Sequence, residues 1–309
     1  MRKKVVIIAI LAIILITLAV AASWSVQGKH RYGGGQNKIA VIHVEGVIAG
    51  GNGGNSLLGE SGGGDEIIRQ LHKARDDSSV KAVILRINSP GGSAPASQEL
   101  GAEIQKLRKD GKIVVASMGD VAASGGYWIA AVTDKIYASP ATMTGSIGVY
   151  IPYANWQDLY QKIGIQKEKI KSGPHKDILS PERPMTAEER AILQGMVDDL
   201  YNQFVTVVAE GRHMDVEQVK QLADGRIYTG SQAKTAGLVD ELGTMYDAID
   251  GAAELAGIKG KPVIKEYGNA SPFSMLFGAS DKVNLEQLMV RHMENKLPIT
   301  APLAMPVEW

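Results

Sequence analysis

The chain has 309 residues and contains no cysteine. This absence excludes disulfide bonds, thiolate metal sites and a cysteine nucleophile, but it leaves the cellular compartment open. Neither sign of charge is in excess, because 33 Lys and Arg residues are matched by 33 Asp and Glu residues. A nucleic-acid partner would require a basic patch or a high isoelectric point, so we expect no such partner.

The amino terminus carries the first positive signal. Residues 1–4 (MRKK) are basic, and residues 5–22 contain one polar side chain, Thr17. A helix of that length just reaches across a bilayer core of about 30 Å. We predict that residues 1–25 are a cytoplasmic tip and a single-pass transmembrane anchor in the cell membrane, with the rest of the chain outside the cytoplasm. A cleaved signal peptide is the alternative, but its apolar region is usually shorter.

Strand-like and helix-like segments alternate along the next part of the chain. Runs of β-branched and apolar residues predict strands at 38–47, 80–88, 112–117 and 135–139. Apolar periodicity and helix-start signals predict helices from Asp65 and over 97–108 and 124–132. This alternation implies βαβ crossovers, and hence an α/β fold with a mainly parallel sheet and flanking helices.

Three further regions complete the predicted domain organisation. Residues 26–37 are glycine-rich and are typical of a flexible tether before the main domain, 38–257. Within that domain, Thr186 and Glu189 predict a capping box at the start of a long helix. We expect this helix to end near Gly211, with shorter helices at 230–236 and 245–256. Residues 258–309 are a weakly patterned carboxy-terminal extension.

Two segments could carry chemistry at the ends of strands. Residues 88–92 (NSPGG) follow a buried strand, where α/β folds place their sites, and glycines there let a backbone N–H face an anion. Residues 122–127 (AASGGY) place Ser124 between small residues at a predicted helix start, where N–H groups favour an oxyanion. Taken singly, the first is equally well explained as a plain turn, and Ser124 as an ordinary N-cap.

Two more segments lie in predicted loops. Residues 144–149 (TGSIGV) also follow a strand, but they lack the ending of a phosphate-binding P-loop. Residues 171–177 (KSGPHKD) contain the turn formers Gly173 and Pro174. A glycine-rich turn and a solvated lysine loop are the plain explanations of these two segments.

Together, however, the four segments resemble the bacterial signal peptide peptidase A family, peptidase family S49. The resemblance covers residues 38–257 and extends to residues 224–230 (DGRIYTG) and 237–240 (GLVD). No one segment is unique, but six in this order are specific. The family has a fold similar to that of the Clp protease and crotonase superfamily.

The resemblance implies a serine endopeptidase with a Ser–Lys dyad and no cofactor. Ser124 would be the nucleophile and Lys176 the general base, with Ser146 holding the Lys176 amine. The N–H groups of Gly92 and Gly125 would form the oxyanion hole. A free lysine is almost wholly protonated at pH 7, so a lysine base requires an apolar surrounding. The same apolar groove would suit leftover signal peptides and other apolar peptides as substrates.

The resemblance also implies an assembly. Double-length members of the family carry the serine in one half and the lysine in the other. This chain carries one of each, so we expect a closed homo-oligomer, an octamer by resemblance, in which Ser124 of one subunit meets Lys176 of the next.

Other interpretations stay open at this point. The first is a Ser–His–Asp peptidase of the Clp type, which would use His175 as its base. The second is a crotonase-like acyl-CoA enzyme, and the third is a non-catalytic membrane scaffold. An extracytoplasmic location disfavours the acyl-CoA enzyme, and an intact Ser124 and Lys176 disfavour the scaffold.

Overall fold

The computed structural model of the chain describes residues 37–51, 55–56, 59–60 and 63–267. The predicted anchor, most of the predicted tether and residues 268–309 lie outside this part of the chain. No helix within the described ranges is both long and apolar enough to cross a membrane.

Eight strands of the described part form one sheet. Its main path has the order β10-β1-β4-β5-β6-β9, and every pairing along it is parallel. These strands are β1 (Lys38–Glu45), β4 (Val80–Ser89), β5 (Ile113–Ala123), β6 (Lys135–Ala138), β9 (Glu241–Leu242) and β10 (Val263–Tyr267). Beside them, β7 (Met143–Gly145) runs parallel to the end of β5 and antiparallel to β8 (Ile227–Thr229). The predicted α/β class with a mainly parallel sheet is confirmed.

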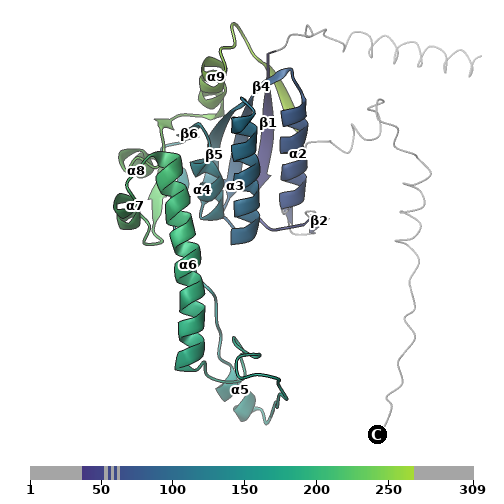
Figure 1. The fold of residues 1–309 in the computed structure, drawn as a ribbon, viewed down its shortest axis with the longest axis vertical. Helices are drawn as coiled ribbons and strands as arrows, with labels where there is room; N and C mark the ends of the chain where they lie inside the picture. The colour runs from purple at the N-terminus through teal and green to yellow at the C-terminus, as the bar shows by residue number, and fades with distance from the viewer. Residues whose placement is uncertain (1–36, 52–54, 57–58, 61–62, 268–309) are drawn as a thin grey trace, which may run out of the picture. The chain divides into compact units, whose positions relative to one another are not determined.

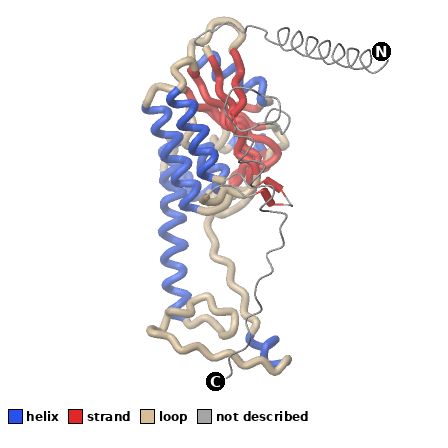
Figure 2. Tube along the Cα trace, turned by 90° about the vertical axis from the view of Figure 1, so that its right-hand side faces the viewer, coloured by secondary structure: helices blue, strands red, loops and turns tan. Residues whose placement is uncertain are grey.

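Both faces of the sheet are buried, as the apolar strand sequences predicted. In β4, Val83 and Leu85 belong to one apolar cluster, whereas Ala82 and Ile84 belong to another. The first cluster packs against α2 (Gly64–Asp76), α3 (Ala94–Lys109) and α4 (Gly125–Ala131), and the second against α9 (Met245–Leu255). Figure 2 shows the long helices standing on one side of the sheet. A strand buried on both sides needs no polar face, which explains the near-continuous apolar runs.

Helix α6 (Ala187–Arg212) begins where the sequence predicted. The Thr186 side chain accepts a hydrogen bond from the Glu189 N–H, and the Glu189 carboxylate accepts one from the Thr186 N–H, so the capping box is confirmed. The helix packs on the domain through its second half, with Phe204 and Val208 buried, whereas most of its first half is exposed. Figure 1 shows this first half extending beyond the sheet.

At the far end of α6 lies a segment that we call the arm, residues 152–186 (Figure 1). It contains one short helix, α5 (Gln157–Lys162), and otherwise consists of turns and irregular backbone. Many of its apolar side chains are exposed, namely those of Trp156, Leu159, Ile163, Ile165 and Ile170. A soluble surface rarely exposes so many large apolar groups without a partner for them.

Several short elements were not predicted. Helices α5 and α7 (Val216–Leu222) and strands β7 to β10 are each seven residues or fewer, too short to show a clear period. The paired dipeptides β2 (Asn55–Ser56) and β3 (Gly59–Glu60) lie within the glycine-rich residues 50–64. The helix α8 (Gly230–Thr235) was predicted. Strand β10 pairs with β1 although it lies beyond residue 257, where we expected the main domain to end.

Candidate active site

Ser124 lies in the tight turn between β5 and α4. Strand β5 runs six residues past its predicted end and leads directly into this turn. The backbone of Ser124 has φ 53° and ψ −120°, a conformation that residues other than glycine rarely adopt. Although Ser124 occupies the N-cap position, its side chain makes no capping hydrogen bond. The N-cap interpretation therefore does not account for the hydroxyl.

The loop after β4 presses against this turn. Gly91 has φ 103°, and a Cβ atom on it would lie 2.7 Å from both the Ser124 Cβ and the Gly125 nitrogen. A Cβ on Gly125 would lie 2.3 Å from Ser97 Oγ and 3.3 Å from the Gly92 nitrogen. Glycine is required at Gly91, because a larger residue would separate the two turns, whereas a side chain at Gly125 would displace the Ser97 hydroxyl.

Two backbone N–H groups that line the pocket with Ser124 are those of Gly92 and Gly125. The Gly92 residue is held in a bridge to Ile48, in which Ile48 donates to the Gly91 carbonyl and Ser93 donates to the Ile48 carbonyl. Within the described ranges, neither the Gly92 nor the Gly125 N–H donates a hydrogen bond to a protein acceptor. These N–H groups are therefore available to a ligand oxygen, as an oxyanion hole requires.

The turn opens into a pocket of about 320 Å³. Its floor carries Ser124, Gly92 and Gly125, so three of the five predicted site residues lie together. Its apolar wall was not predicted from the sequence and consists of Pro95, Trp128, Val149, Ile151, Leu200 and Phe204. The residues of this wall come from α3, α4, α6 and the loop after β7, so no local pattern could have gathered them. The pocket could hold an apolar side chain next to the Ser124 hydroxyl.

Ser146 lies close to Ser124 because of the pairing of β7 with β5. The register places Gly145 opposite Ala123, and the Ser124 N–H donates to the Gly145 carbonyl at 2.8 Å. Ser146 follows immediately, with φ 50°, and its N–H donates to the Arg226 carbonyl at 2.8 Å. Ser146 is half-buried beside the Ser124 turn.

Lys176 lies elsewhere. It is an exposed residue of the arm and does not line the Ser124 pocket. Its N–H donates to the Gly173 carbonyl at 3.3 Å, and its side chain makes no hydrogen bond or ion pair with any described residue. Within one chain, therefore, the structure does not bring the predicted base to the predicted nucleophile.

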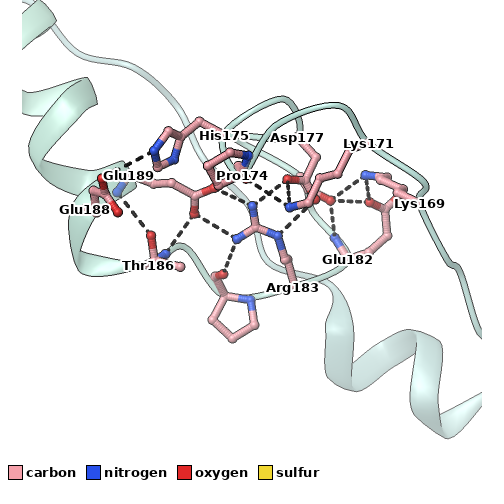
Figure 3. A network of polar contacts seen from close by, with 12 residues as sticks. Lys169, Lys171, Pro174, His175, Asp177, Glu182, Arg183, Thr186, Glu188 and Glu189 are labelled. Carbon is pink, nitrogen blue, oxygen red and sulfur yellow. Dashed lines mark hydrogen bonds and ion pairs between the residues drawn. The ribbon is translucent and has the colours of Figure 1, made fainter.

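The arm around Lys176 is held by a network of ion pairs (Figure 3). The Asp177 carboxylate pairs with Arg183 and Lys171, and Arg183 also pairs with Glu189. The hydrogen bonds from Arg183 lower the pKa of Glu189 to about 2 and hold the pKa of Asp177 well below its usual range. The hydrogen bond from Lys169 lowers the pKa of Glu182 to about 2. The sequence pattern did not indicate the role of Arg183, because its partners depend on how the loop folds.

His175, the base in the alternative Ser–His–Asp interpretation, also lies on the arm. Its Nε2 atom is 3.4 Å from a Glu188 carboxylate oxygen, and its buried Nδ1 has no partner among the described residues. No histidine of the described part lines the Ser124 pocket. That part also contains no cluster of three or more His, Asp or Glu side chains that could hold a metal ion.

Comparison with known proteins gives the same family. The sequence profile of peptidase family S49 matches residues 106–259. A protein of Enterococcus faecium with the provisional name signal peptide peptidase SppA is 41% identical over 237 residues, covering 77% of this chain and 69% of the relative. A provisionally named protease of Methanocaldococcus jannaschii is 38% identical over 282 residues, 87% of each chain.

A longer relative matches over only part of its length. Protease 4 of Haemophilus influenzae is 39% identical over 260 residues, which is 82% of this chain but 42% of the relative. The shorter relatives are matched over more than two thirds of their length, and the profile falls on the segment that contains both Ser124 and Lys176. The chain belongs to peptidase family S49.

Proposed function

We propose that the chain is a serine endopeptidase in which Ser124 is the nucleophile. The observation that carries this proposal is the setting of Ser124, in a strained turn beside two available N–H groups and an apolar pocket. Strain of this kind persists where function requires it, as in the nucleophile turn of other hydrolases. Membership of family S49 supports the same assignment.

The proposed reaction is acyl transfer to Ser124. The Ser124 Oγ attacks the peptide carbonyl while the neutral Lys176 amine takes its proton, and the amine then returns that proton to the leaving nitrogen. The Gly92 and Gly125 N–H groups stabilise the oxyanion, and the Ser146 hydroxyl orients the Lys176 amine. Water activated by Lys176 hydrolyses the acyl-enzyme and frees Ser124.

We propose further that Lys176 reaches Ser124 from a neighbouring subunit. Two observations support this: Lys176 is absent from the pocket of its own chain, and the arm that carries it exposes a row of large apolar side chains. Those side chains would be buried if the arm lay against a second copy. A closed ring repeats one such contact at every subunit, and by family resemblance we expect eight subunits.

The substrates and the location are part of the same proposal. The apolar pocket suits peptides rich in residues such as Leu and Ala, and one relative carries the name signal peptide peptidase. Residues 1–25 would anchor the catalytic domain outside the cytoplasm, where cleaved signal peptides must be removed. The scaffold alternative would not need an open pocket at Ser124.

The direct test is degradation of a synthetic signal peptide by the full-length protein and by Ser124→Ala, with the cut sites mapped by mass spectrometry. We expect turnover to fall by a factor on the order of 10⁴ or more, with an unchanged unfolding midpoint. Ser146→Ala is the matched control and should retain part of the activity. Loss of activity in Ser146→Ala alone would reverse the assignment of the nucleophile.

The pH profile distinguishes a lysine base from a histidine base. With Lys176 as base, kcat/KM should rise with pH and level off on the alkaline side of neutrality, whereas a histidine base would place the rise near pH 6.5. A rise near pH 6.5 that survives in Lys176→Arg and disappears in His175→Gln would overturn the lysine assignment.

A further inference from the structure

We propose that Arg183 is a positioning residue for the general base. It ties the loop that carries Lys176 to the first turn of α6, and it holds the neighbouring Asp177 carboxylate away from the lysine amine. This inference rests on the proposed function of Lys176, and the experiments below separate the two.

Arg183 binds the loop through the Asp177 carboxylate. Its Nε donates to one Asp177 oxygen at 3.0 Å and its Nη2 to the other at 2.7 Å, a two-point contact that fixes the plane of the carboxylate. Lys171 Nζ donates to the same carboxylate at 2.6 Å and to the Pro174 carbonyl at 3.0 Å. Charged side chains thereby hold the chain on both sides of Lys176, at the Pro174 carbonyl and at the Asp177 carboxylate.

The same guanidinium also binds the start of α6 through the Glu189 carboxylate. Arg183 Nη1 donates to a Glu189 oxygen at 2.8 Å, and Nη2 contacts the other oxygen. Glu189 is almost fully buried and also accepts the Thr186 N–H at 2.9 Å, so it is fixed by the capping box. Arg183 therefore connects a rigid helix end to the Asp177 carboxylate, one residue from Lys176, as Figure 3 shows.

This connection matters because it is a two-point charged contact between the loop and α6. The other described ion pair between them is looser, with His175 Nε2 3.4 Å from a carboxylate oxygen of the exposed Glu188. Residues 172–180 contain turns but no helix or strand, and the side chain of Lys176 has no described partner. A base must be placed within a fraction of an ångström of the proton that it takes, and a small displacement can cost about a hundredfold in rate. We therefore expect loss of the Arg183 contacts to displace the loop by more than that.

Charge gives Arg183 a second effect. A free carboxylate beside an amine favours the protonated amine, which cannot act as a base. Arg183 and Lys171 occupy the Asp177 carboxylate, so its charge is already paired. The charged and titratable groups around the loop are Lys169, Lys171, His175, Asp177, Glu182, Arg183, Glu188 and Glu189. Loss of Arg183 would leave Lys171 on Asp177 Oδ1 and would free Asp177 Oδ2 to pair with Lys176.

The test compares Arg183→Met and Arg183→Lys in the full-length protein with a synthetic apolar peptide. In Arg183→Met we expect kcat to fall about a hundredfold with KM within about threefold, because the substrate pocket is untouched. The rising limb of the pH profile should also move by about one unit to higher pH. Arg183→Lys keeps the charge but not the two-point grip, so it should retain an intermediate kcat and a limb near the wild-type position.

A double variant separates the two effects of Arg183. Adding Asp177→Asn to Arg183→Met removes the freed carboxylate, so the limb should return towards its wild-type pH while kcat stays low. A merely structural role for Arg183 would lower stability without moving the limb. Arg108→Met is the matched control, because Arg108 also pairs with a carboxylate, that of Asp134 at 2.7 Å, and lies outside both the pocket and the arm. Its kinetics should match the wild type.

Lys176→Ala distinguishes failure of this inference from failure of the proposed function. If Lys176→Ala hydrolyses the peptide at the wild-type rate, Lys176 is not the base and the proposed function fails. If Lys176→Ala is inactive while Arg183→Met keeps both the wild-type kcat and the wild-type limb, the proposed function stands and the positioning role is wrong.

Discussion

At the scale of single residues, the close packing around Ser124 depends on glycines, whose lack of a side chain lets neighbouring backbone segments approach. Gly91 meets both requirements that make glycine necessary, a positive φ and a backbone neighbour within reach of a Cβ atom. Residues 88–92 (NSPGG) therefore allow the loop after β4 to lie directly against the turn at Ser124. The two consecutive glycines have different neighbours, because Gly91 lies against Ser124 and Gly92 lies against Ile48.

Gly91→Ala should damage both stability and activity. The new methyl group would lie 2.7 Å from the Ser124 Cβ, and φ 103° is unfavourable for alanine, so we expect a loss of about 3 kcal/mol in the free energy of unfolding. Chemical denaturation and peptide hydrolysis measure the two effects. Gly111→Ala is the control: φ is also positive, at 83°, but nothing lies within 4 Å. It should lose about 1 kcal/mol and remain active, and an equal loss in both variants would contradict the steric account.

At the scale of elements, α6 depends on a close approach to α4. A Cβ atom on Gly211 would lie 1.9 Å from the Ala131 carbonyl oxygen, so Gly211→Ala should separate the two helices and cost about 3 kcal/mol. Gly195, on the same helix, has nothing within 4 Å, and Gly195→Ala should raise stability by about 1 kcal/mol through helix propensity. Denaturation curves of the two variants should move in opposite directions, and a shift of both in one direction would refute the packing argument.

The start of α6 should respond to acid. Arg183 lowers the pKa of Glu189 from 4.5 to about 2, so the carboxylate stabilises the folded state above pH 4.5. That contribution is lost as the pH falls from about 4.5 to about 2, because in this range the unfolded chain takes up a proton that the folded protein does not. Amide hydrogen exchange of residues 172–192, corrected for intrinsic rates, should show increased opening over this range. Glu189→Gln should open to a similar degree at pH 5 and pH 3, whereas a large pH-dependent change in that variant would assign the effect to another group.

At the scale of the whole molecule, the separation of Ser124 from Lys176 predicts complementation. Co-expression of Ser124→Ala with Lys176→Ala, each inactive alone, should restore activity wherever an intact serine faces an intact lysine of another subunit. The recovered activity is measured on purified mixed oligomers carrying two different tags. Confirmed mixed oligomers without activity would show that both residues act within one chain.

The sequence by itself determined the order of the longer strands and helices and the gathering of three candidate site residues. Apolar runs such as those of β4 and β5 encode buried parallel strands locally, and the carboxyl ends of parallel strands share one edge of a sheet. Gly92 and Gly125 thus come to Ser124 through local patterns alone. The capping box at Thr186 is local as well, so the start of α6 could be predicted to the residue.

Only the tertiary structure decided the rest. The pairing of β7 with β5 brings Ser146 beside Ser124, and the apolar wall of the pocket combines residues from four elements. The arm, which contains Lys176, lies at the far end of α6 (Figure 1), and the path of the same loop brings Arg183 to its two carboxylates. These features depend on contacts between distant segments, whose energies no local periodicity records. For that reason the sequence could name the candidate residues, whereas the structure was needed to show that Lys176 does not line the Ser124 pocket of the same chain.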